Sequence, residues 1–317
     1  MTGEHRPTYA ELCARTDGPP ASSWGLWGPE DQIGALNLLT AEHVVRASRL
    51  VTRGAQFPLN WRLEQPQPAL FHRGPLEHVK VDDGFGMDDH FNNFFPHGST
   101  HWDSLAHFRH PEHGYYGGRT ADQLKGPAAQ NSIAEWARRG VAGRFLLADV
   151  DTWRTNAGRP IAHAAADVIT IEDVAETLEA QGCAAEEGDI LLLRAGWVHW
   201  YERLASDQRR RLADEPWAAH APGLSADMAT LAWLWDTGIV AVASDLPAVE
   251  PMPFDPHGPC LHACALALLG INLGEMFALD ALARDCAGDG RYTGLLVSAP
   301  MNFTGATGSP ANAVALK

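Results

Sequence analysis

The stretch DILLLRAGW, residues 189–197, holds four consecutive aliphatic residues between Asp189 and Arg194, and the small residues Ala195 and Gly196 follow. A short aliphatic run without polar alternation is typical of a strand that is covered on both faces. Three further stretches share this pattern: RFLLADV (144–150), IVAVASD (239–245) and GLLVSAP (294–300). The sequence therefore predicts a sheet whose central strands are buried.

Segments with helical spacing lie near and between these strands: SIAEWARRG (132–140), TIEDVAETLEAQG (170–182) and SADMATLAWLWDTG (225–238). Thr170 and Ser225 are the expected N-caps, and Gly182 and Gly238 are expected to end their helices. Strands that alternate with helices predict an α/β fold. The N-terminal third has strand-like segments broken by proline and few helical signals, which favours an irregular or antiparallel portion there.

Residues 1–40 begin with a segment rich in Gly, Pro and Trp, and we expect them to form an extended arm that packs by its aromatic side chains. Residues 41–317 are expected to form a single domain. The Pro/Gly-rich stretches at 65–75 and 247–259 also contain apolar residues, so they do not have the composition of flexible linkers.

The 317 residues include 39 acidic and 24 basic side chains, for a net charge of −15 at pH 7. Nucleic-acid backbones and anionic membranes attract clustered Lys and Arg, and the sequence has no such cluster. No run approaches the roughly 18 apolar residues of a membrane span, and the polar N-terminus lacks the apolar core of a signal peptide. The five cysteines are scattered, which is typical of reduced thiols. We therefore expect a cytoplasmic protein with a small-molecule substrate, and neither a nucleic acid nor a membrane as partner.

The segment FFPHGSTHWDSLAHF, residues 94–108, places three histidines and one aspartate between apolar flanks. His97, His101, Asp103 and His107 are all odd-numbered, so in a strand they share one face. Alternate positions lie about 6.6 Å apart, which lets His101 and Asp103 converge on one ion. His97 and His107 would be about 33 Å apart in a straight strand, so we expect bends near Gly98 and after Asp103.

Two imidazoles and a carboxylate form the ligand set of a catalytic Zn²⁺, or of Mn²⁺ or Fe²⁺, with positions left open for water. Core histidines satisfied by hydrogen bonds are the alternative. Further ligands have to come from elsewhere, and the best candidates are His262, which starts an apolar helical run, and Glu275, which lies in an apolar segment. A buried ionised Glu is costly unless it is paired or bound to a metal. An ordinary helix cap is the alternative for Glu275.

The segment HGSTHWDSLAHF (97–108) resembles the His-x-Gly-Thr-His-x-Asp-x-Pro-x-His signature of the cyclase-like metal hydrolases, which include kynurenine formamidase and isatin hydrolase. Ser99 stands in place of the family's central Gly and Leu105 in place of its usual Pro, which affects the bend rather than the ligands. The likeness extends to three stretches that are similar to the longer bacterial branch of putative cyclases: WGPEDQIGALNLLT (27–40), GDILLLRAGW (188–197) and LLGINLGEMFALDALARDCAGDGRY (268–292).

The resemblance implies that His97, His101 and Asp103 are primary ligands of a divalent metal, Zn or Mn, present as one or two ions. It implies that His107 binds a second ion or transfers a proton, and that two later residues, His262 and Glu275, complete the metal centre. It further implies a swivelling β/β/α-type cyclase-like fold with a mixed sheet flanked by helices. Family members are homo-oligomers, and a dimer or tetramer is expected here, with N-terminal arms that help to close neighbouring sites.

The main hypothesis is a metal-dependent hydrolase that cleaves an amide, N-formyl or lactone bond of a small cyclic or aromatic metabolite. His107, His262 and Glu275 are its candidate catalytic residues, and His107 or Glu275 would take the proton. A metal-dependent cyclase, dehydratase or isomerase of secondary metabolism is the first alternative. A non-catalytic small-molecule-binding protein with a vestigial site is the second.

Aromatic residues beside the ligand run or in the arm are candidate substrate contacts, and each has plain core packing as its alternative: Trp24, Trp27, Phe94, Phe95 and Trp102. Asp245 follows a predicted strand, where α/β proteins tend to place site residues. A turn or capping role is the alternative for Asp245. The sequence contains no nucleophile elbow, dinucleotide-binding glycine loop or P-loop, so a metal site is the only catalytic machinery it indicates.

Overall fold

The computed structural model describes residues 6–215, 218–254 and 260–317. Its helices are α1 (Tyr9–Ala14), α2 (Ala41–Ser48), α3 (Ile133–Arg139), α4 (Val150–Asn156), α5 (Ile171–Ala180), α6 (Trp197–Glu202), α7 (Ser206–Asp214), α8 (Met228–Thr237) and α9 (Asp280–Asp289). Three tighter or wider helical segments are η1 (Gly34–Leu38), η2 (Tyr116–Gly118) and the π-helical η3 (Ala263–Leu269).

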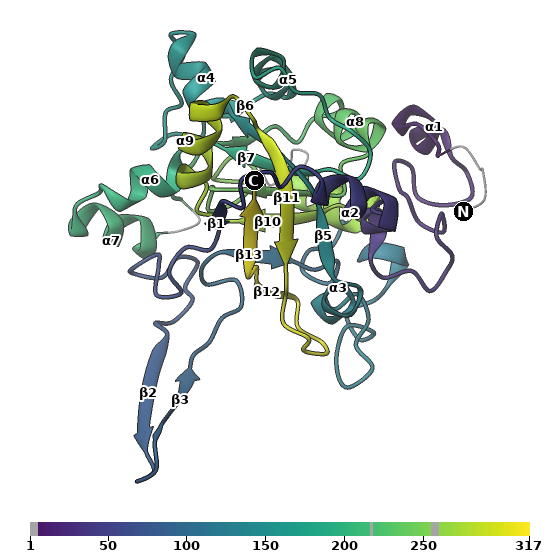
Figure 1. Cartoon of the computed structure of the whole chain (residues 1–317). Coiled ribbons are helices and arrows are strands. Elements are labelled where there is room, and N and C mark those ends of the chain that lie inside the picture. The colour runs from purple at the N-terminus through teal and green to yellow at the C-terminus, as the bar shows by residue number, and fades with distance from the viewer. Residues whose placement is uncertain (1–5, 216–217, 255–259) are drawn as a thin grey trace.

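A mixed sheet of nine strands forms the centre of the molecule, in the order β1-β13-β11-β5-β7-β9-β10-β4-β12. The four middle strands β5, β7, β9 and β10 run parallel, and the strands on either side of them pair antiparallel. Figure 1 shows the helices packed around this sheet. The predicted α/β fold, with a mixed sheet flanked by helices, is confirmed. The strands of this sheet are β1 (Gln56–Pro58), β4 (His101–Asp103), β5 (Val141–Asp149), β7 (Ile190–Arg194), β9 (Ala241–Ser244), β10 (Asn272–Glu275), β11 (Thr293–Ser298), β12 (Gly308–Pro310) and β13 (Ala313–Leu316).

Strand β7 illustrates why the central strands read as uninterrupted apolar runs. Leu191 and Leu193 point into a core that is shared with α5 and α8. Ile190 and Leu192 point the other way, into a core that is shared with α3 and α9. Because helices cover both faces, alternation between polar and apolar residues would bury polar groups without partners, and the strand is apolar throughout.

Most of the predicted helix ends agree with the ends that the structure shows. Ser132 accepts the N–H of Ala134 at the start of α3, Thr170 forms a capping box at the start of α5, and Gly238 ends α8 in the left-handed region. The prediction that Ser225 caps α8 was wrong. Asp227 is the cap and accepts the Thr230 N–H at 2.8 Å, while the Ser225 hydroxyl lies 2.5 Å from the Asp227 carboxylate.

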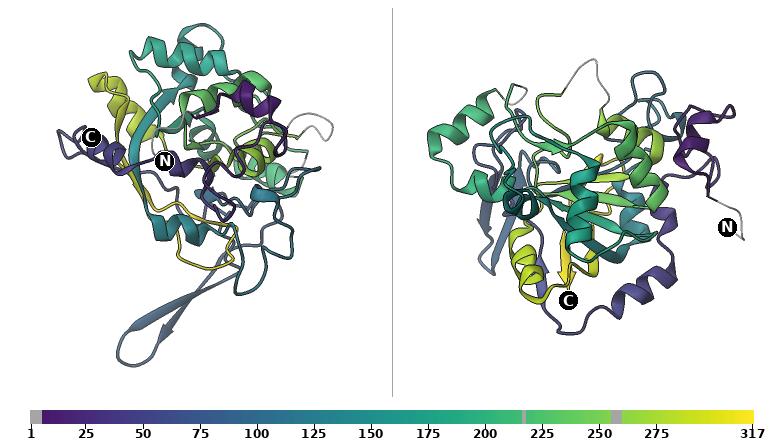
Figure 2. Two further views of the ribbon diagram at one scale, coloured as in Figure 1. Left: turned by 90° about the vertical axis from the view of Figure 1, so that its right-hand side faces the viewer. Right: turned by 90° about the horizontal axis from the view of Figure 1, so that it is seen from above.

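The N-terminal third contains the antiparallel portion that the sequence indicated. Strands β2 (Glu77–Asp82) and β3 (Met87–Asn92) pair as a hairpin, which projects from the body of the molecule in two views (Figures 1 and 2). A second small sheet joins β6 (Val168–Ile169) to β8 (Gly223–Leu224). Residues 6–40 lie against the body, where the Trp24 indole donates to the Ala267 carbonyl oxygen at 2.7 Å. The division of the chain at residue 40 stays a prediction.

Candidate metal centre

Strand β4 positions the first two candidate ligands. It is only three residues long, and its alternation sends His101 and Asp103 to one face and Trp102 to the other. The pairing of β4 with β10 places His101 directly opposite Glu275, the last residue of β10. Residues 174 positions apart in the sequence are therefore cross-strand neighbours, whose side chains contact each other in a sheet.

The chain turns on both sides of β4, as the spacing required. The Gly98 N–H donates to the Phe95 carbonyl before the strand, and the His107 N–H donates to the Ser104 carbonyl after it. These turns bring the His97 and His107 rings into a stack with centroids 4.3 Å apart. The segment is therefore a short strand between two turns, and its histidines meet over Asp103.

Asp103 is the centre of the cluster. Its Oδ1 lies 3.4 Å from Nε2 of His97, 3.4 Å from Nε2 of His101 and 3.7 Å from Nε2 of His107. Two groups of three residues could each hold a metal ion: His97, Asp103 and His107, and His101, Asp103 and Glu275. Because Asp103 belongs to both groups, these residues could hold one ion or two.

His262 approaches from the end of the chain segment that precedes η3. Its Nε2 lies 3.0 Å from Oε1 of Glu275 and 3.5 Å from Oδ2 of Asp103. It belongs to neither group of three, and its nearest contacts are carboxylates. Glu275 ends a strand, so the alternative of a helix cap for this residue does not apply.

Two hydrogen bonds outside the cluster hold the imidazoles in place. Nδ1 of His101 lies 2.8 Å from the Ser99 carbonyl oxygen, and Nδ1 of His262 lies 2.6 Å from Oε1 of Glu250. A proton on Nδ1 of His101 leaves its Nε2 as the lone-pair donor that faces the cluster, the tautomer that metal-bound histidines use. Burial would lower the pKa of His262, but the carboxylates of Asp103, Glu250 and Glu275 raise it well above its ordinary value, so His262 donates from both ring nitrogens, to Glu250 and to Glu275. Glu250 also accepts the backbone N–H groups of Leu261 and His262, at 2.8 and 2.9 Å. Sequence reasoning missed Glu250, although it lies only five residues beyond Asp245.

Whether the cluster fits a cation depends on whether its buried polar atoms already have hydrogen-bond partners. Nε2 of His97, Nε2 of His101 and both carboxylate oxygens of Asp103 are buried without a hydrogen-bond partner. Buried polar atoms normally have a partner, because an unmet one costs about 1–3 kcal/mol. Four such atoms that face one another, all lone-pair donors, fit a divalent cation as their common partner.

The ionisation of the carboxylates agrees with this fit. Burial would raise the pKa of Glu275, but the neighbouring imidazoles of His101 and His262 lower it to about 2. Burial would likewise raise the pKa of Asp103, but the nearby imidazoles of His107 and His101 lower it well below its ordinary value. Burial lowers the pKa of His101, yet the proximity of the two carboxylates raises it to about 9. Two buried negative charges at one point require a positive partner, either protons on histidine or a cation.

Burial is the main influence on the pKa values of His97 and His107. Desolvation, together with the neighbouring imidazoles His101 and His107, brings the pKa of His97 well below 6.5. Burial also lowers the pKa of His107. Both imidazoles are therefore neutral at pH 7, which is the form that binds metal.

The aromatic residues proposed as substrate contacts lie in different places. Phe94 and Phe95 line a cavity of about 570 Å³ at the base of the β2–β3 hairpin. Trp24 and Trp27 pack on the body of the chain, Trp27 edge-on to Trp235 with centroids 6.2 Å apart.

Trp102 does not fit the proposed substrate contact. Its side chain is fully buried on the face of β4 opposite His101 and Asp103. There it packs against Trp136 and Phe277, with ring centroids 5.5 and 5.0 Å away. Trp102 is therefore a core residue, which was the alternative to a substrate contact. It faces away from the ligands because adjacent strand residues face opposite sides of a sheet.

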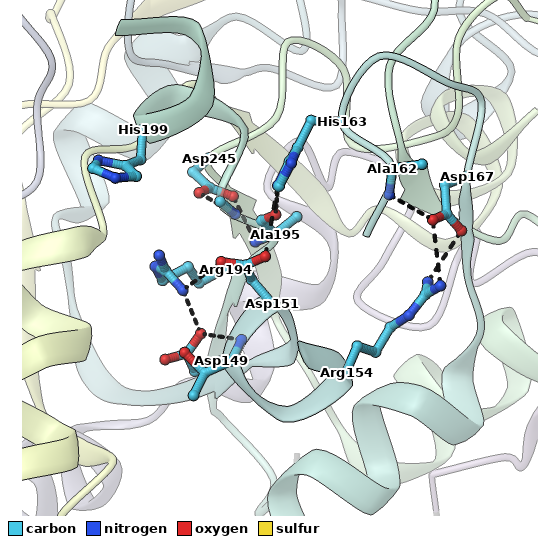
Figure 3. Close-up of polar contacts among 12 residues, drawn as sticks. Asp149, Asp151, Arg154, Ala162, His163, Asp167, Arg194, Ala195, His199 and Asp245 are labelled. Carbon is cyan, nitrogen blue, oxygen red and sulfur yellow. Dashed lines mark hydrogen bonds and ion pairs between the residues drawn. The ribbon is translucent and has the colours of Figure 1, made fainter. Parts of the chain in front are cut away.

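A second polar cluster lies where β5, β7 and β9 end, and Figure 3 shows its contacts. Asp245 accepts the N–H groups of Ala195 and Gly196 at 2.7 and 2.8 Å, and burial raises its pKa to about 7 against the opposing charge of Arg194. Arg194 forms ion pairs with three aspartates: Asp149, Asp151 and Asp280. Asp245 and Arg194 are therefore partnered within the chain and tie the strand ends together, which corresponds to the turn role that was the alternative for Asp245.

The fold and the cluster define an α/β protein with a candidate metal centre of His, Asp and Glu at the edge of a mixed sheet. The chain belongs to the putative cyclase family, whose model matches residues 39–251. A comparison with curated proteins gave no match. In the part of the chain that the structure describes, no helix has the length and apolar character to cross a membrane.

Several solved structures share the fold. A crystal structure described as a novel cyclase is 29% identical, with a TM-score of 0.83, over 93% of this chain and 99% of that chain. Isatin hydrolase A from Labrenzia aggregata, bound to benzyl benzoate, is 17% identical, with a TM-score of 0.60, over 83% of this chain and 93% of that chain. An isatin hydrolase bound to the product analogue thioisatinate is also 17% identical, with a TM-score of 0.60, over 88% of this chain and 99% of that chain. At 17% identity, these two hydrolases show a shared fold only.

Proposed function

We propose that this protein is a metal-dependent hydrolase that cleaves an amide, N-formyl or lactone bond of a small cyclic or aromatic metabolite. The observation that carries the proposal is the set of buried, partnerless lone-pair atoms on His97, His101 and Asp103. The family and the fold of the isatin hydrolases support it.

The ion would be held by His97, His101, Asp103 and Glu275, and Zn²⁺ or Mn²⁺ suits this donor set. A divalent ion in such a site supplies an activated water at neutral pH and polarises a carbonyl oxygen. Glu250 orients His262, and His262 in turn holds Glu275 by its Nε2. In this proposal His262 positions the metal ligands.

His107 is the proposed proton carrier or second-ion ligand. Its side chain is 26% exposed, against 11% or less for the other members of the cluster. Its neutral imidazole can take a proton from the attacking water and return it to the leaving amine or alkoxide. This partial exposure lets that proton exchange with solvent.

The test combines metal analysis with isotope labelling. The purified protein is expected to contain Zn or Mn and to hydrolyse members of a panel of formanilides, cyclic amides and aromatic lactones in H₂¹⁸O, with one ¹⁸O in the carboxylate product. The substitutions His101→Ala and Asp103→Ala are expected to abolish both metal content and turnover, whereas His90→Ala, on the exposed hairpin, serves as the matched histidine control. Product without label would favour the cyclase or isomerase alternative, and tight binding without turnover would favour a vestigial site.

We further propose a homo-oligomer. The β2–β3 hairpin is exposed along nearly its whole length and carries apolar side chains, among them Phe85 and Met87. A two-stranded hairpin alone in water is marginally stable, so contact with a second copy of the chain would stabilise it. Light scattering on the purified protein is expected to give a multiple of 34.4 kDa, and a monomer would contradict this.

A further inference from the structure

Arg73 is a charged side chain beside the metal centre that the proposed function does not use. Its guanidinium donates to the carbonyl oxygen of His97 and lies over the Phe71 ring, 5.0 Å from the centroid. Within the residues that the structure describes, no carboxylate forms an ion pair with Arg73. A guanidinium has five N–H donors in a planar fork, so most of the donors of Arg73 remain available.

Arg73 connects the metal centre to the cavity at the base of the β2–β3 hairpin. The cavity of about 570 Å³ is lined by Arg73, by Phe94 and Phe95, and by Gly98, the residue next to His97. Through Gly98 and Arg73, the cavity therefore borders the turn that carries His97. A cavity of this size accommodates a small aromatic molecule, because ligand pockets have volumes of about 300–1,000 Å³.

The charges around the site favour an anion at this position. Glu250 is paired with His262, so Asp103 and Glu275 provide two unpaired negative charges, which a divalent cation would offset. Asp103 and Glu275 lie near enough to Arg73 to act on it electrostatically. Arg73 then adds one positive charge, which attracts an incoming anion.

We propose that Arg73 binds a carboxylate of the substrate, so that the molecule hydrolysed here is an aromatic acid whose scissile bond lies within reach of the metal. The inference rests on the proposed hydrolase function and narrows its substrate class. A planar guanidinium fork matches both oxygens of a carboxylate, which a lysine ammonium in the same place does not. Phe94 and Phe95 in the cavity wall would contact the ring of the acid.

Benzoate and benzamide are suitable probes, because they have nearly the same shape and differ in charge. Calorimetric titration of the full-length, metal-loaded protein is expected to show tighter binding of benzoate. Arg73→Gln is expected to weaken benzoate binding at least tenfold and to leave benzamide binding within twofold of wild type. Arg62→Gln is the matched control, since Arg62 lines the same cavity but is largely exposed and lies 3.7 Å from Glu64.

A purely structural role for Arg73 predicts a different result. If Arg73 only held the His97 turn, Arg73→Gln would lower the metal content or weaken both probes equally, and either outcome would overturn the proposal. Equal binding of benzoate by wild type and Arg73→Gln, or no preference for benzoate in wild type, would also overturn it. Arg73→Lys, which keeps the charge and a donor for the His97 carbonyl, is expected to retain part of the benzoate affinity. Because the readout is binding, failure of the hydrolase proposal appears separately, as missing turnover or missing metal.

Discussion

Glu250 provides the sharpest test of how the candidate metal centre is held together. Glu250 forms no contact with another carboxylate of the cluster, yet it accepts four hydrogen bonds: two from His262, one from the Leu261 N–H and one from the Cys260 thiol. Glu250→Gln keeps the shape of the side chain, removes its charge, and loses one acceptor, because its amide nitrogen must face a backbone N–H. His262 would then hold Glu275 less firmly.

The expected magnitude follows from the behaviour of such outer partners. Loss of a partner that orients a metal-site histidine weakens metal binding by about 10–100-fold. Glu250→Gln keeps one oxygen for Nδ1 of His262, so we expect metal binding to weaken by about tenfold, the lower end of this range, or about 1.4 kcal/mol. Glu250→Ala removes every acceptor and is expected to approach 100-fold.

The assay is a competition between the protein and a fluorescent zinc chelator at pH 7, with circular dichroism as the check on folding. Glu176→Gln, an exposed glutamate on α5, is the matched control and is expected to bind zinc as wild type does. If Glu250→Gln bound zinc as tightly as wild type while Asp103→Ala lost it, Glu250 would have no part in the metal site and the reasoning would be refuted.

Three further predictions concern other parts of the molecule. Asp103→Ala is expected to leave no detectable metal by mass spectrometry, since both ligand groups share this residue; retention of one equivalent would contradict that. Trp102→Ala is expected to cost about 3–5 kcal/mol in urea unfolding, because it removes a buried side chain that packs on Trp136 and Phe277; unchanged stability with a raised KM would argue instead for substrate contact. The folded pKa of Asp245, about 7, lies above its ordinary 3.8, so its protonated form stabilises the fold at low pH and that contribution is lost as the pH rises through 7. Urea midpoints of wild type relative to Asp245→Asn should therefore fall from pH 4 to pH 7.5, and a constant difference would contradict the assignment.

The sequence by itself determined the buried strands, most helix ends and the fold class. Uninterrupted aliphatic runs such as Ile190–Leu193 specify a strand covered on both faces, because a polar residue at any of these positions would be buried without a partner. Local caps such as Thr170 depend on residues within one turn, so they too could be predicted. The period of two in the segment at 97–107 likewise indicated which side chains share a face.

Tertiary structure alone decided which residues surround those side chains. The β4–β10 pairing brings Glu275 to His101, and the choice of strand partner depends on the packing of the whole sheet. Glu250 was missed because its role comes from a contact with His262, 12 positions further along the chain, which no local spacing reveals. Trp102 was proposed as a substrate contact because it neighbours two ligands in sequence, yet alternation in β4 directs it into the opposite core. Sequence patterns report local geometry and burial, whereas a metal centre is made by side chains that only the folded chain brings together.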